Sequence, residues 1–256
     1  MSTFAEERPP PPLHQETALP ATAHPGTIPP TGPHPGIVDL WMLHLPQADD
    51  QAQDTPGLDT SVLSPDEQRR ACAFARPRDR LRYTFAHTAL RRLLGAQLGL
   101  PPQDLAFTRE PCPCCGAPHG RPALADPPLP LHFSLSHGGD LVLIGTAAVP
   151  VGVDVEPVPA PSVVADLAGV MHPAEQAELA AAPAARRPAA FTRLWARKEA
   201  YLKALGTGLG RDLAADYLGT TGLAAPPTGW TVTDLPAGPS HAAACAAPSP
   251  AAPTTL

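Results

Sequence analysis

Short stretches of alternating or continuous apolar residues recur along the chain, and they predict β-strands. The segment from His132 to His137 alternates, with apolar side chains on one side and serines on the other. Pro150 interrupts a longer apolar run, which therefore predicts two strands rather than one. The predicted strands cover residues 37–45, 132–137, 141–149, 151–155 and 230–235, and the alanine- and proline-rich residues 247–256 are expected to form a frayed tail.

Apolar residues at helical spacing mark two longer segments. They recur every three to four positions over residues 79–98, and Gly99 is suited to end that helix. The same spacing predicts a helix over residues 189–205. Ser64, three residues before Glu67, predicts a capping box at the start of a shorter helix. Helices and strands in mixed order predict an α+β protein.

The composition narrows the class of protein. The 256 residues include 37 prolines and 20 glycines, which we expect to concentrate in loops and tails. Ten of the prolines fall in residues 1–36 and predict a disordered tail, followed by an N-terminal lobe over residues 37–150 and a C-terminal lobe over residues 151–246. The sequence shows no membrane-spanning stretch and no signal peptide, so five cysteines favour a reduced, cytoplasmic protein. Membrane proteins, collagens and disulfide scaffolds are excluded.

Charged residues are unevenly distributed. The net charge of −6 argues against bulk attraction to nucleic acid, yet eight of the 16 arginines fall within residues 69–92. This cluster is either a solvated helix face or a patch for an anionic ligand or an acidic partner protein. Lysine occurs only at positions 198 and 203, and a compact ammonium group at these two places suggests point contacts with phosphate.

Two acidic residues share one face of a predicted strand. In the sequence Val-Gly-Val-Asp-Val-Glu, Asp154 and Glu156 alternate with valines and lie about 6.6 Å apart along the strand. Carboxylates this close repel each other unless a positive charge lies between them, and a divalent cation would supply it. The alternative is an exposed strand face with two solvated acids.

The predicted helix over residues 189–205 adds a third carboxylate and both lysines. Trp195, Glu199 and Lys203 line up along one flank, and the tryptophan ring is expected to pack in the core. Glu199 and Lys203 could also form an ordinary surface pair. Lys198 falls within the apolar stripe, where its ammonium group must reach water, a carboxylate or a phosphate. Three carboxylates and two lysines are suitable parts for a Mg²⁺-dependent phosphate-handling site.

Several motifs together resemble a known family. Phe-Ser-Leu-Ser-His ends at His137, Gly-Val-Asp-Val-Glu ends at Glu156, and Trp-Ala-Arg-Lys-Glu-Ala-Tyr-Leu-Lys ends at Lys203. In their order and separation these motifs resemble the 4′-phosphopantetheinyl transferases of the larger, Sfp-like type. An Arg-x-x-Cys-x-Phe motif that starts at Arg69 and a Gly-Arg-Pro motif at residues 120–122 also fit, and the resemblance covers about residues 63–210.

The resemblance implies a fold and a reaction. It implies two similar α/β lobes related by a pseudo-twofold axis, with the active site between them. It implies a monomer that moves 4′-phosphopantetheine from coenzyme A to a serine hydroxyl of an acyl or peptidyl carrier protein, with Mg²⁺ as cofactor. Polyketide, nonribosomal peptide and fatty acid synthesis all use such carriers. Neither a membrane nor nucleic acid is expected as a partner.

The resemblance also implies roles for individual residues. Asp154, Glu156 and Glu199 would bind Mg²⁺, and Glu199 would also act as the general base. Lys203 and Lys198 would hold the pyrophosphate. The other coenzyme A contacts that the resemblance implies are Arg70, Arg82, Gly120, Arg121, Pro122, Ser136 and His137. The sequence departs from the family pattern where Arg121 replaces a lysine and where Glu67 replaces a basic residue.

Two other interpretations are open. A Mg²⁺-dependent nuclease would use the acid pair and a lysine, although such a lysine is expected on a strand beside the acids. A zinc-holding binding or regulatory module would use Cys112, Cys115 and His119, whose spacing is typical of zinc fingers, with Cys114 as the nearest fourth ligand. The alternative for these residues is a loop with reduced thiols.

Overall fold

The computed structural model describes residues 13–16, 38–46, 58–221 and 226–249, which form two main β-sheets and a small hairpin. The first sheet has the strand order β1-β2-β6-β5 and the second has the order β7-β9-β8. Among the described strand pairs of these sheets, β1 and β2 alone are parallel. The strands of these sheets are β1 (Leu13–Glu16), β2 (Val38–His44), β5 (His132–Gly138), β6 (Leu141–Ala147), β7 (Gly152–Pro157), β8 (Trp230–Leu235) and β9 (His241–Pro248). The hairpin pairs β3 (Phe107–Arg109) with β4 (Pro122–Leu124).

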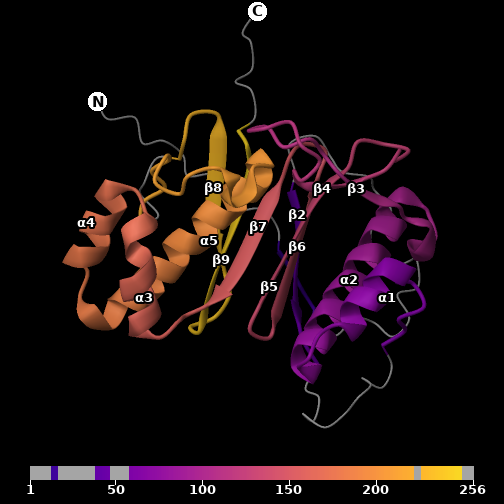
Figure 1. Ribbon diagram of the computed structural model, residues 1–256, viewed down its shortest axis with the longest axis horizontal. Helices are drawn as coiled ribbons and strands as arrows, with labels where there is room; N and C mark the ends of the chain where they lie inside the picture. Colours follow the sequence, from indigo (N-terminus) through magenta and orange to yellow (C-terminus); the bar gives the residue numbers. More distant parts are fainter. Residues whose placement is uncertain (1–12, 17–37, 47–57, 222–225, 250–256) are drawn as a thin grey trace, which may run out of the picture.

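Helices cover the outer sides of the two sheets. Figure 1 shows α1 and α2 on one side of the molecule and α3, α4 and α5 on the other, with the strands between them. The helices are α1 (Pro65–Cys72), α2 (Pro77–Leu98), α3 (Pro161–Leu167), α4 (Pro173–Ala181) and α5 (Arg187–Leu205). The predicted α+β class is therefore confirmed. No helix in the described part of the chain is long and apolar enough to cross a membrane.

Three apolar clusters connect these layers. Trp41 and Ile144 belong to the cluster between α2 and the first sheet, whereas Leu40 and Val153 belong to the cluster between the two sheets. A third cluster, which includes Leu194, lies under α5. Neighbouring residues of β2 thus face two different cores, and burial of both faces explains the unbroken apolar run of this strand.

The edges of the two sheets meet where β5 runs beside β7. The backbone amide of Val153 donates to the hydroxyl of Ser134 at 3.0 Å, and the amide of Val155 donates to the hydroxyl of Ser136 at 3.3 Å. The serine hydroxyls of β5 therefore accept hydrogen bonds from buried backbone amides of β7, in place of the backbone carbonyl groups of a paired strand. We refer to this contact between β5 and β7 as the seam.

The predicted elements agree well with the structure. The helix predicted over residues 189–205 begins two residues earlier, and the helix predicted over 79–98 begins at Pro77. The capping box is confirmed, because the Ser64 hydroxyl accepts from the Glu67 amide and the Glu67 carboxylate accepts from the Ser64 amide. All five predicted strands form, with ends that shift by one or two residues.

Two terminal expectations were wrong in part. β9 extends to Pro248 and is the central strand of the second sheet, so the tail is not frayed at residues 247 and 248. Alanines dominate this strand and hid it from a pattern based on large apolar residues, but Ala244 and Ala246 are the right size to lie beneath α5. Within the proline-rich region, Leu13–Glu16 pairs with β2 as a strand. The rest of the two predicted tails, apart from Ser249, lies outside the described residues, and the lobe boundary near residue 150 stays a prediction.

The close contact between β7 and α5 leads to the first testable prediction. A Cβ atom at Gly152 would overlap the carbonyl oxygen of Ala200 and the amide nitrogen of Ala204. Gly152→Ala should therefore force β7 and α5 apart and lower the free energy of unfolding by about 1–3 kcal/mol. Gly169→Ala is the control, since a Cβ there meets no atom within 4 Å. Equal stability of the two variants in denaturant melts would contradict this account.

Candidate active site

A buried carboxylate lies at the centre of the seam. Asp154 of β7 is only 2% exposed. Its Oδ1 atom accepts a hydrogen bond from the Ser136 hydroxyl at 2.7 Å and pairs with the Lys203 ammonium group at 2.6 Å. The Lys203 ammonium group also donates to the carbonyl oxygen of Val153. The Oδ2 atom of Asp154 is buried without a hydrogen-bond partner in the described residues, and a carboxylate oxygen in this situation can accept a cation or a water molecule.

Two further carboxylates stand near Asp154. Loss of hydration raises the pKa of Glu156 to about 7, and the negative charge of Asp154 adds to the effect. Burial also raises the pKa of Glu199, although the neighbouring Lys203 opposes the shift. One ammonium group therefore does not compensate three acids, and the seam has a deficit of positive charge.

The donor set fits a hard divalent cation. Asp154, Glu156 and Glu199 offer carboxylate oxygens, which Mg²⁺ prefers, and the orphaned Oδ2 atom is the first position for it. In the described residues the ligand atoms of these acids do not all lie within 4.8 Å of one another. The other carboxylate oxygen of Asp154, Oδ1, is paired with the Lys203 ammonium group. The sequence interpretation of solvated acids on an exposed face is wrong for Asp154, because it is buried.

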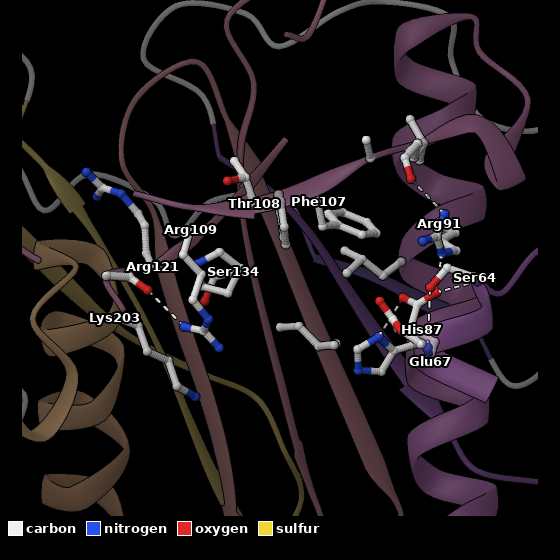
Figure 2. A pocket seen from close by; sticks show the side chains of 18 of the residues that line it. Ser64, Glu67, His87, Arg91, Phe107, Thr108, Arg109, Arg121, Ser134 and Lys203 are labelled. Atoms are coloured by element: carbon white, nitrogen blue, oxygen red, sulfur yellow. Dashed lines mark hydrogen bonds and ion pairs between the residues drawn. The ribbon is translucent and has the colours of Figure 1, made fainter. Parts of the chain in front are cut away.

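A cavity of about 1100 Å³ lies beside this cluster. Figure 2 shows Lys203, Arg121 and Ser134 on one side of it and Glu67, His87 and Arg91 on the other. Four of the predicted residues line the cavity: Gly120, Arg121, Pro122 and Lys203. Basic and aromatic residues that were not predicted line it as well. Those lining residues are His87, Arg91, Phe107, Arg109 and Phe133.

Arg121 connects the two halves of the molecule. Its Nε atom donates to Glu110 at 2.6 Å, and a terminal nitrogen donates to the carbonyl oxygen of Ala204, in the last turn of α5, at 2.6 Å. Gly120 is buried, and a side chain there would overlap the Glu110 carbonyl group. The Gly-Arg-Pro motif thus holds one arginine against the end of α5 at the wall of the cavity.

The remaining predicted contacts lie on β5, α1 and α2. Arg82 donates to the carbonyl oxygen of Gly139, in the turn after β5, at 2.9 Å. Loss of hydration lowers the pKa of His137, and the positive charges of Arg82, His87 and Lys203 contribute. The His137 ring is thus exposed on β5 and has positive charges from α2 and α5 in its surroundings. Arg70 is exposed on α1 and does not line the cavity.

Lys198 has a different role from the one that the resemblance implied. Its ammonium group is 2.8 Å from the carboxylate of Glu175, which is fully buried, and it donates to the carbonyl oxygens of Leu213 and Asp216. The structure therefore places Lys198 inside the C-terminal core and does not bring it to Asp154. The expectation that its head must reach a partner is confirmed, and that partner is Glu175 of α4. Trp195 packs beside Phe191, as expected.

The arginine cluster of residues 69–92 is only partly a surface patch. Arg91 is 2% exposed, donates to Glu67 at 2.7 Å and lies over the Phe107 ring. Glu67, which departs from the family pattern, is the acceptor for this buried arginine and for His87. A count of charges along the sequence does not distinguish this internal ion pair from a solvated helix face. The one available signal was the spacing of His87 and Arg91, which lie one helical turn apart and can therefore contact the same acid.

Comparison with known proteins decides the family. Residues 150–242 match the model of the 4′-phosphopantetheinyl transferase superfamily. Over 178 residues the chain is 34% identical to the 4′-phosphopantetheinyl transferase HetI of Nostoc sp., and the alignment covers 68% of this chain and 70% of that relative. The chain belongs to the 4′-phosphopantetheinyl transferase superfamily. It is accordingly an enzyme that transfers 4′-phosphopantetheine from coenzyme A to a carrier protein.

Two further 4′-phosphopantetheinyl transferases are similar to the chain. Psf-1 of Bacillus pumilus is 30% identical over 54% of this chain and 55% of its own length. Sfp of Bacillus subtilis is 26% identical over 60% of this chain and 64% of its own length. The chain thus aligns with less than two thirds of each of these two relatives. The superfamily match includes all three seam carboxylates and both lysines, so it coincides with the site that the geometry marks.

The second prediction concerns the buried pair of Lys198 and Glu175. Lys198→Met should lower the free energy of unfolding by about 3–5 kcal/mol, because it leaves Glu175 buried without a compensating charge. Adding Glu175→Gln should recover part of this loss, since a glutamine oxygen can still accept from the Leu218 amide. Denaturant melts of the two single variants and the double variant measure the coupling. Additive effects would contradict a direct pair.

The third prediction concerns Glu67 and pH. Burial raises the pKa of Glu67, but hydrogen bonds from His87, the Ser64 amide and Arg91 outweigh it and lower the pKa to about 2. Glu67→Gln should therefore lower the free energy of unfolding by about 3 kcal/mol near neutral pH. This difference in stability from the unmodified protein should shrink as the pH falls from about 4.5 toward 2. Over that range Glu67 is protonated in the unfolded state but still ionised in the folded state, so the unmodified protein loses its advantage.

Asp66→Asn is the matched control for Glu67→Gln. Asp66 is the preceding residue of α1, and its side chain is 83% exposed in a surface pair with Arg69. This variant should change stability little at any pH. Thermal melts over a pH series would measure both variants, and parallel curves for the two would contradict the role given to the buried pair.

Proposed function

We propose that the protein converts an apo acyl or peptidyl carrier protein to its holo form in a Mg²⁺-dependent reaction at the seam. In this proposal the two sheets and their helices form similar lobes related by a pseudo-twofold axis, and the active site lies between them. The observation that carries the proposal is Asp154, a buried acid with one unpartnered oxygen beside two carboxylates of raised pKa. The adjacent cavity supports it, because coenzyme A needs a large site with positive groups, and Arg109, Arg121 and Lys203 are among the lining residues.

Asp154, Glu156 and Glu199 would hold the Mg²⁺ ion. When bound, the ion would neutralise negative charge on the pyrophosphate of coenzyme A. Lys203 lies between these acids and the cavity, so its ammonium group can contact a phosphate oxygen as well as Asp154. Lys203 compensates the Oδ1 atom of Asp154, whereas Oδ2 has no hydrogen-bond partner among the described residues.

Glu199 is the proposed general base. A raised pKa brings a carboxylate closer to the working pH, at which it accepts a proton most effectively. The carrier serine would give its proton to Glu199 while its oxygen forms a bond to the β-phosphorus of coenzyme A. The bond from that phosphorus to the bridging oxygen breaks, and adenosine 3′,5′-bisphosphate leaves with the negative charge. Lys203 would stabilise the charge that develops on the transferred phosphoryl group.

Several elements supply candidate contacts for coenzyme A. Arg121, Gly120 and Pro122 line the cavity and would bind the nucleotide end. Arg82 of α2, which donates to the Gly139 carbonyl oxygen, would also bind the nucleotide end. Ser136 and His137 of β5 would contact coenzyme A as well, His137 at the adenosine phosphates. Arg70 would reach the ligand only from the exposed surface of α1, and Lys198 is left out of the binding site because it is paired with Glu175.

The carrier protein would approach along exposed arginines of α1 and α2. Of the cluster in residues 69–92, Arg69, Arg70, Arg76 and Arg80 are exposed, whereas Arg91 is internal. Such a surface would attract an acidic carrier. We propose a cytoplasmic monomer that binds neither nucleic acid nor membrane, in keeping with five free cysteines and the net negative charge. A nuclease is disfavoured, because Lys203 projects from a helix.

The fourth prediction tests the general base. Glu199→Ala should abolish transfer without unfolding the protein, because Glu199 is half-buried and accepts no side-chain hydrogen bond from the described residues. Incubation with coenzyme A, Mg²⁺ and a panel of apo-carriers, followed by mass spectrometry of the carrier, measures the transfer. Asp166→Asn, an exposed acid on α3, is the control and should keep full activity. Phosphopantetheine transfer by Glu199→Ala at the unmodified rate would overturn the assignment.

The fifth prediction tests the metal ligands without measuring activity. Mg²⁺ should raise the melting temperature of the unmodified protein, since an ion that binds only the folded state stabilises it. The effect should disappear in Asp154→Asn and persist in Asp166→Asn. A Mg²⁺-dependent shift of equal size in all three proteins would show that the ion binds elsewhere.

A further inference from the structure

A compact loop outside the transferase machinery brings together three metal-ligand side chains. The loop over residues 110–121 joins β3 to β4. The amides of Gly116 and Cys115 donate to the Cys112 carbonyl oxygen at 2.7 and 3.3 Å, and the Cys112 amide donates to the carbonyl oxygen of Ala117 at 2.8 Å. Gly116 has a φ of +73°, which lets the chain turn back at this point. The backbone therefore forms a tight double turn around Cys112.

The side chains inside this turn converge. One ligand atom from each of Cys112, Cys115 and His119 lies within 4.8 Å of the other two, and the Cys115 sulfur is 3.0 Å from His119 Nε2. Among the described residues, this is the one group of three such side chains with that spacing. Cys112 is buried at the base of the loop, whereas Cys115 and His119 are exposed. The group thus has a fixed inner ligand and two outer ligands that can adjust.

The donor atoms of this group favour a thiophilic cation. Two cysteine sulfurs and one imidazole nitrogen are ligand types that Zn²⁺ takes in proteins. In contrast, the seam offers oxygen ligands only, so the two sites differ in the metal that they prefer.

We propose that Cys112, Cys115 and His119 bind one Zn²⁺ ion, with a water molecule in the fourth position. Zinc binds sulfur at about 2.3 Å and nitrogen at about 2.0 Å, so the ligand atoms of a tetrahedral site are roughly 3.5–4 Å apart. The observed group is compact enough to reach this geometry through small side-chain rotations. Both outer ligands face solvent, which leaves room for the water. Cys114 lies outside the group of three and is not a ligand.

The ion would have a structural role at the cavity wall. Residues 118–122 line the cavity, and His119 is two positions before Arg121. Backbone hydrogen bonds between Glu110 and residues 120–121 close the base of the loop, but no disulfide closes its tip. A metal ion bound there would order the tip of the loop and so hold Arg121, which donates to the carbonyl oxygen of Ala204 in α5, in place.

Metal content of the purified protein is the first test. The full chain, prepared with a reducing agent and without chelators, should hold one zinc per molecule by elemental analysis. Replacement of zinc by Co²⁺ should give the charge-transfer absorption of a cobalt–thiolate site. Protein that holds no zinc and shows no such absorption on Co²⁺ titration would overturn the proposal. Neither readout depends on transferase activity, so failure of the proposed function would leave this result unaffected.

Variants test the ligand set. Cys115→Ser and His119→Gln change exposed residues, so these proteins should fold and should lose at least tenfold in Co²⁺ affinity. Cys72→Ser removes an exposed thiol on α1 and should bind Co²⁺ as the unmodified protein does. Cys114→Ser should also retain binding, and a loss equal to that of Cys115→Ser would overturn the assigned set. A disulfide between Cys112 and Cys115 that persists in protein prepared with a reducing agent would also overturn the proposal. Alkylation of free thiols followed by mass spectrometry would detect it.

Discussion

The buried carboxylate of Asp154 is the constraint on which the rest of the site depends. A charged group at 2% exposure is stable only if neighbouring groups compensate it, and the fold supplies Ser136 from one sheet and Lys203 from α5. Both partners must come from other elements, because β7 itself offers only its backbone and Glu156. The position of Asp154 therefore fixes the distance between β5, β7 and α5. Its Oδ2 atom has no hydrogen-bond partner among the described residues, and this free acceptor is what the proposed cation site depends on.

The same electrostatic requirement gives the only two lysines different roles. Lys198 and Lys203 lie on one helix five residues apart, which places them on different faces. Lys198 points into the core beneath α5 and neutralises Glu175, so it stabilises the packing of α5 against α4. Lys203 points to the seam, keeps 30% of its side chain exposed and can still meet a ligand. A lysine in an apolar stripe indicates a buried partner, but the sequence does not reveal whether that partner is a protein carboxylate or a phosphate.

Candidate metal ligands gather at two places in the molecule. The seam collects oxygen donors from β7 and α5, which are far apart in the sequence, whereas the loop over residues 110–121 collects sulfur and nitrogen donors within eight positions. The first arrangement requires the whole fold and can serve catalysis, since its ligands are joined to the cavity through Lys203. The second requires only a turn, and it lies next to Gly120 and Arg121, where order of the loop matters for the cavity.

The sequence by itself determined the α+β class, the family, most strands, the long helices and the acids of the seam. These features follow from local periodicity, capping and motifs, which depend on neighbours within a few residues. Only the tertiary structure decided the role of Lys198, the internal position of Arg91, the basic and aromatic lining of the cavity, and the alanine-rich central strand β9. Each of these depends on a partner from another element, such as Glu175, Glu67 or α5. The identity and the burial of such a partner are not encoded in residue spacing along the chain.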